Sequence, residues 1–154
     1  MSLGREAIYS TFFNQITQQL RTPIGYFNYC GRRSVGVGGL SVGQYPAFFL
    51  LELGEDYDRT QLFAPAKVIL HASGVIHSLV GAVPDETPVT VLNNLADQVE
   101  DAVQAACGST AQNTLSGLVQ QAWIAGRQVT IPPSYPNKWA VQIMSIDMVL
   151  PNSR

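Results

Sequence analysis

The chain has 154 residues, of which 46% are hydrophobic and 13% charged, and nine lysines and arginines stand against eleven acidic residues for a net charge of -2. A chain of this length forms one ordinary domain, and so low a charged fraction predicts that other chains cover part of its surface. The charge balance argues against nucleic acid or an acidic membrane as the main partner. Because no signal-peptide core and no membrane-length apolar stretch is present, we expect a soluble protein made in a cytoplasm.

The first twenty residues predict an amphipathic helix. Ser2 suits the N-cap, and Pro23 lies just past the expected end near Leu20. The apolar side chains recur at helical spacing and form one stripe: Leu3, Ala7, Ile8, Phe12, Ile16 and Leu20.

The next part of the chain predicts strands. Aromatic residues from Ile24 to Cys30 favour a first strand, and the run "YPAFFLLEL" favours a second with Pro46 at its first position. A polar connection, residues 55–65, leads to a strand over residues 66–81. Alternation along this strand predicts one wet side, with Lys67, His71, Ser73 and His77 facing water and Val68, Leu70, Ala72 and Ile76 facing inward.

Residues 85–108 predict a second helix, with Thr87 and Pro88 at its start and Gly108 as its stop. Its apolar stripe consists of Leu92, Leu95, Ala96, Val99, Ala102, Val103 and Ala106. Residues 114–131 favour one or two strands broken near Gly126. The segment "PPSYPN" favours a loop, and residues 138–151 favour a long final strand.

This order of elements predicts one α+β domain over residues 1–154. We expect a mostly antiparallel sheet with two helices packed on one face. A glycine-rich arm or loop is expected at residues 34–44.

The stretch "RRSVGVGGLSVGQ", residues 32–44, has the glycines of a phosphate loop without its other parts. No lysine precedes Lys67, and a dinucleotide fingerprint that starts at Gly36 and Gly38 would need glycine where Ser41 stands. The interleaved aliphatic side chains indicate a segment that orders against a partner, and the two arginines favour carboxylates over phosphate. The candidates for a subunit interface are therefore Arg32, Arg33, Val35, Val37, Leu40, Val42 and Tyr45.

No catalytic, cofactor or metal set is predicted. His71 and His77 lie too far apart along one strand to share a ligand, and we expect both to be polar residues of the wet sheet face. Cys30 and Cys107 have no CxxC or Cys/His neighbour, so we expect two reduced thiols.

Five stretches carry a family resemblance as a set and in order: "REAIYSTFF", "RR" after the first strand, "QYPAFFLLE", "LNNLADQVEDAV" and "TLSGLVQQAWIAG". Together they resemble the tail-terminator, or tail-completion, family of long-tailed bacteriophages. The resemblance implies an α+β subunit that forms a ring, commonly a hexamer, at the head-proximal end of the tail tube. Such a ring ends tube polymerisation and offers the neck an attachment surface.

The resemblance also implies the partners and the location. The partners would be further copies of the chain, the tail tube protein, and a neck or head-completion protein, with no cofactor, no membrane, and nucleic acid only as DNA passing through the ring. The protein would assemble in the host cytoplasm and reside in the virion, at the tail-neck junction.

Other functions stay open from the residues alone. One is a different ring protein of the neck, connector or tail tube. Another, from a different class, is a small nucleotide-dependent enzyme that uses the glycine-rich segment with Arg32 and Arg33, and a third is a small cytosolic adaptor.

Overall fold

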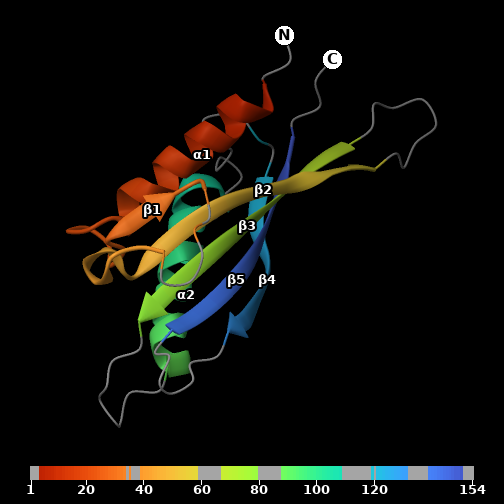
Figure 1. The fold of residues 1–154 in the computed structure, drawn as a ribbon. Coiled ribbons are helices and arrows are strands. Elements are labelled where there is room, and N and C mark those ends of the chain that lie inside the picture. The colour runs from red at the N-terminus through yellow and green to blue at the C-terminus, as the bar shows by residue number, and fades with distance from the viewer. Residues whose placement is uncertain are drawn as a thin grey trace.

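The computed structural model describes residues 4–33, 35, 39–58, 67–79, 88–108, 119, 121–131 and 139–150. The elements follow in this order (Figure 1): α1 (Arg5–Leu20), β1 (Tyr29–Gly31), η1 (Val42–Gln44), β2 (Ala47–Asp58), β3 (Lys67–Leu79), α2 (Pro88–Val103), η2 (Gln104–Gly108), β4 (Gln121–Ile131) and β5 (Trp139–Val149).

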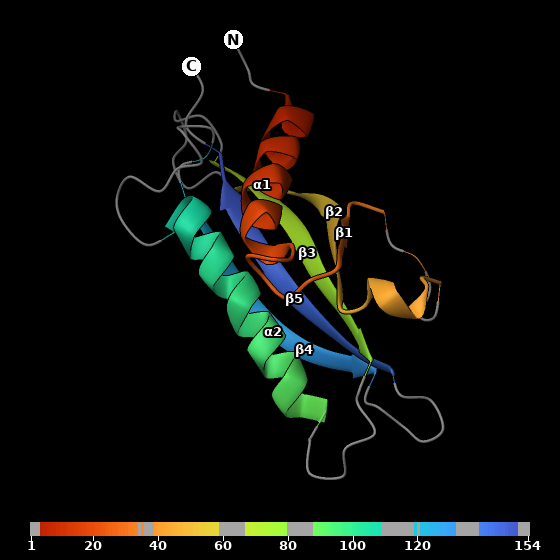
Figure 2. The same ribbon diagram turned by 90° about the vertical axis from the view of Figure 1, so that its left-hand side faces the viewer.

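The strands form one five-stranded sheet in the order β1-β2-β3-β5-β4. β1 pairs with β2 in parallel, and the other three pairings are antiparallel. Both helices lie on the same side of the sheet, as Figure 2 shows. The predicted α+β class, with its mostly antiparallel sheet and two helices on one face, is therefore confirmed.

The main core lies between this face of the sheet and the helices. α1 buries Ile8, Phe12 and Ile16, and α2 buries the stripe from Leu92 to Val103. The strands contribute the even-numbered residues of β3 and β5, because successive strand side chains alternate between faces. Removing this apolar surface from water is the main force that holds the helices on the sheet.

Three predicted boundaries need correction. α1 begins at Arg5 with Gly4 as its N-cap, and Ser2 lies outside the described residues. The strand expected from Ile24 to Cys30 shrinks to Tyr29–Gly31, because the preceding residues form a turn in which the Phe27 and Leu20 carbonyls accept backbone hydrogen bonds. A Cβ at Gly25 would collide with the Leu20 carbonyl oxygen, so glycine is needed there.

The third correction concerns residues 55–58, which were expected in a polar connection but extend β2 to Asp58. They pair with β3 as far as Lys67. A register shift between Glu52 and Gly54 reorients the strand, and polar side chains beyond it pair with residues on both sides of the sheet. The polar residues 55–58 therefore belong to β2.

β3, α2, β4 and β5 lie within their predicted ranges, and Thr87 and residues 114–118 lie outside the described residues. β4 is one strand with a register shift between Ile124 and Gly126, where a break was expected, and the loop "PPSYPN" lies outside the described residues. Neither helix of the described part is long and apolar enough to cross a membrane.

Candidate functional site

Arg32 lies directly after β1 and joins three elements. Its guanidinium donates to Glu6 of α1, at 2.5 Å and 3.1 Å, and to Glu52 of β2. The hydrogen bonds from Arg32 lower the pKa of the Glu6 carboxyl. The carboxylate partners of Arg32 in the described chain thus belong to its own subunit, and a contact with a neighbouring subunit stays a prediction.

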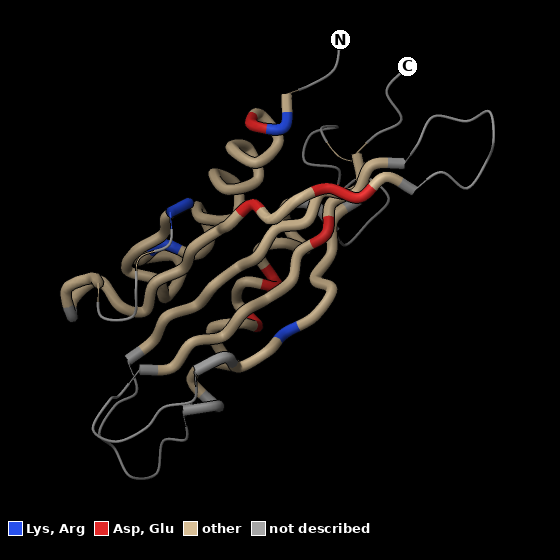
Figure 3. Tube along the Cα trace, turned by 45° about the vertical axis from the view of Figure 1, so that its right-hand side comes forward, with Lys and Arg blue, Asp and Glu red and all other residues tan. Residues whose placement is uncertain are grey.

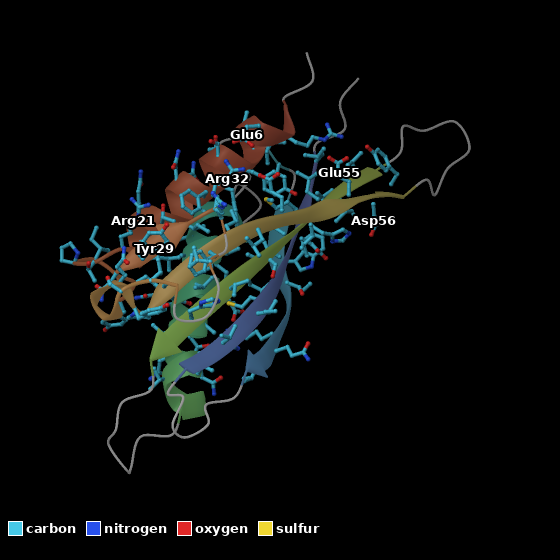
Figure 4. The ribbon with its side chains drawn as sticks, viewed as in Figure 1. Glu6, Arg21, Tyr29, Arg32, Glu55 and Asp56 are labelled. Carbon is cyan, nitrogen blue, oxygen red and sulfur yellow. The ribbon has the colours of Figure 1, made fainter. Side chains whose placement is uncertain are left out.

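Arg33, the next residue, has a different environment. It is exposed and has no hydrogen bond or ion pair with any residue that the structure describes. It lines a shallow surface hollow beside Tyr29, Leu51 and Leu53 (the label of Tyr29 in Figure 4 marks the place). Leu53 is 66% exposed, so this hollow combines apolar surface with a cation that has no partner among the described residues. Glu6 and Glu52, both paired with Arg32, line it as well.

The glycine-rich segment packs in part on its own chain. Val35 and Leu40 contact a second apolar cluster on the sheet face opposite the helices, and Tyr45 is a buried member of that cluster. The Tyr45 hydroxyl accepts a hydrogen bond from the Leu40 backbone N–H at 3.2 Å. Val37 and the side chain of Val42 lie outside the described residues. Among the interface candidates, Tyr45 is therefore buried by its own chain, whereas Arg33 is exposed.

His71 lies on that same open face, between two carboxylates. Its Nδ1 is 2.6 Å from Asp147 of β5 and its Nε2 is 2.6 Å from Asp56 of β2. Both ring nitrogens must carry a proton to donate to both carboxylates. The hydrogen bonds to Asp147 and then Asp56 accordingly raise the pKa of His71.

His77 corrects the prediction of a wet face. Both histidines do share one face, but His77 is 4% exposed and Ser73 5% exposed. The His77 ring meets the ring of Phe49 edge to face at 5.0 Å, and its Nδ1 has no hydrogen-bond partner in the described part of the chain. Burial lowers the pKa of His77. The second cluster covers this end of the face, which the alternation of polar residues could not reveal.

A second surface feature, missed from the sequence, lies at the opposite edge of the sheet. Arg127 of β4 pairs with Asp97 and Glu100 of α2 and so ties the helix to the edge strand. A small hollow lies between the end of α2 and the start of β4, lined by Glu100, Val103, Gln104, Ala122, Trp123 and Ile124. The helical spacing of Asp97, Glu100 and Asp101 was a signal for this acidic stripe.

The described side chains form no recognisable reaction centre. The hydrogen bonds of His71 lead only to carboxylates, and no group of three metal-ligating side chains in the described ranges could hold a metal ion. Burial raises the pKa of the Cys30 thiol, which keeps it in the poorly nucleophilic form.

No protein-family model and no curated protein sequence matches the chain. Among solved structures, it is similar to a chain of the virion of a native gene transfer agent particle, with a TM-score of 0.51 and 13% sequence identity. The likeness covers 94% of this chain and 97% of that chain. The two therefore share one fold over nearly their whole lengths.

Proposed function

We propose that the protein is a structural virion protein of a long-tailed bacteriophage. More specifically, we propose a tail terminator that assembles as a hexameric ring at the head-proximal end of the tail tube. There it ends tube polymerisation and presents a surface to a neck or head-completion protein, while DNA passes through the ring. The tail-neck junction of the virion is its final location, after assembly in the host cytoplasm.

The observation that carries this proposal is the shared fold with a virion chain over 94% and 97% of the two lengths. Fold alone does not fix function, because one fold hosts many functions. The surface chemistry adds support: Arg33 and Leu53 lie exposed in one hollow, as expected of a subunit that binds other subunits. The five-part sequence resemblance is the support for the position within the tail.

Light scattering of the purified protein, alone and with tail tubes, tests the proposal. We expect a mass that is a multiple of the 16.7 kDa chain and a ring at one end of each tube. Electron microscopy of particles that lack the protein separates ring types: overlong tails support a terminator, whereas normal-length tubes without heads indicate a joining protein of the neck.

A nucleotide-dependent enzyme is the alternative from another class. A thermal-shift screen with nucleotides would show stabilisation for such an enzyme, because a bound ligand raises the melting temperature. We expect no shift for the wild type. Stabilisation that disappears in Arg32→Ala and Arg33→Ala would contradict the structural role.

A further inference from the structure

Each of the two lateral edges of the sheet has a strand with one side unpaired among the described residues. β1 pairs with β2 only from Ala47 to Phe49, so from Leu50 to Asp58 β2 has no strand on its outer side in the described part of the chain. At the opposite edge, β4 is paired only with β5 within the same described ranges. Edge strands that offer unpaired N–H and C=O groups are templates for pairing with another chain.

The unpaired part of β2 and the first half of β4 lie at the same level of the sheet. The register runs from Glu52 to Ala72, from Ala72 to Ile146, and from Ile146 to Ile124. Three successive antiparallel pairings also leave β2 and β4 antiparallel to each other. A second copy displaced sideways along this row would therefore bring its β4 antiparallel to the edge of β2 that has no strand beside it among the described residues.

The two edges also have complementary side chains. On the β2 side, the exposed Leu53 lines one hollow with Arg33, which has no partner among the described residues. On the β4 side, Val103 and Trp123 line a hollow at the same level. Glu100 and Gln104 also line this hollow, so it offers both apolar and polar groups. An exposed leucine beside an arginine on one edge and such a mixed hollow on the other are suited to one head-to-tail contact.

The charged side chains of the two edges are also complementary. Asp101 is exposed next to Glu100 on α2 and has no hydrogen bond or ion pair within the described residues. With Asp97, the α2–β4 edge has three carboxylates against one guanidinium, that of Arg127. Figure 3 shows further acidic positions along the sheet, and those on β2, namely Glu52, Glu55 and Asp56, are paired within the chain with Arg32, Arg5 and His71. Arg33 on one edge and Asp101 on the other have no such partner among the described residues, so they are free to meet across a contact.

We propose that neighbouring copies of this chain bind head to tail, with the β2 edge of one copy, Arg33 and Leu53 included, seated on the α2–β4 edge of the next, Asp101 included. This inference rests on the proposed function, since it specifies the contact of the proposed ring. A contact between two different surfaces of identical subunits forms a ring when the rotation closes. In such a ring, the sheets of adjacent copies continue one another.

Two charge reversals test the contact: Arg33→Glu and Asp101→Arg. Each variant alone places like charges at every contact, so we expect self-association at least about tenfold weaker than wild type by light scattering. An equimolar mixture should recover the wild-type mass with the two variants alternating, because each reversed edge then faces a reversed partner. The control is Arg21→Glu, the reversal of an exposed arginine that does not line the hollow. It removes one hydrogen bond to the Cys30 carbonyl and should still assemble normally.

The outcomes separate the two proposals. If the wild type assembles and both single variants assemble equally well, the proposed contact is wrong and the proposed function stands. The same holds if the mixture of the two variants does not recover the wild-type mass. A wild type that stays monomeric at every concentration, with and without tail tubes, overturns both. Circular dichroism of each variant shows whether a loss of assembly arises with the fold intact.

Discussion

His71 and His77 occupy the same face of β3, but the first is held between Asp56 and Asp147 while the second is buried against Phe49. The pKa of His71 is raised and that of His77 is lowered. The folded state therefore favours the protonated form of His71 and the neutral form of His77. The difference arises from what covers the two ends of the face, since the strand itself is the same.

The two shifts give opposite pH dependences. The stabilisation by His71 is complete below its unfolded pKa of about 6.5 and is lost as the pH rises through its higher folded pKa. For His77 the unfolded chain binds the proton more readily, so stability falls as the pH drops below about 6.5 toward its lower folded pKa. We expect these two contributions to be separable by substitution.

Removing the cover of His77 should have the largest effect. Phe49 is fully buried between His77 and Tyr29 in the second cluster. Phe49→Ala should lower the free energy of unfolding by about 3–5 kcal/mol in denaturant titrations, because it leaves a cavity. It should also raise the pKa of His77 toward its ordinary value, measured by NMR.

Ile24→Ala is the matched control for that substitution. Ile24 is 77% exposed, so its truncation should change the free energy of unfolding by less than about 0.5 kcal/mol. If Phe49→Ala lowers the free energy of unfolding by no more than Ile24→Ala does, the residues around His77 do not form a packed core.

His77→Phe should have an intermediate effect. The substitution keeps an aromatic ring against Phe49 and removes the unsatisfied Nδ1, so it should stabilise the protein at pH 7 by about 1 kcal/mol. It should also remove most of the histidine-dependent loss of stability between about pH 6.5 and pH 5. An unchanged acid slope in denaturant titrations would show that His77 is not the group that titrates.

The sequence predicted which residues share a face better than what packs on that face. Periodicity correctly separated His71 and His77 from Leu70 and Ile76, because alternation is a local property of a strand. It failed at His77, because the cover comes from distant residues such as Tyr45 and Val141. Such contacts depend on the fold of the whole chain.

The candidate site shows the same division between local and long-range information. The sequence singled out the double arginine but not the difference between its two residues, which arises because Arg32 pairs with Glu6 and Glu52 whereas Arg33 pairs with no described residue. Neither partner is close in the chain. The α2–β4 edge was missed because it unites a helix and a strand that the sequence separates by a long segment.

The smallest effect is expected for His71→Gln, which keeps a polar side chain between Asp56 and Asp147 but removes the cation. His71 is partly exposed, so solvent screening limits the loss to about 0.5–1 kcal/mol at pH 6. The sign decides the interpretation: the difference from wild type should shrink as the pH rises, because the wild-type histidine then loses its proton as well. A difference in the free energy of unfolding that stays constant from pH 6 to pH 9 would mean that the imidazole acts through packing, and that His71 and His77 differ less than their surroundings imply.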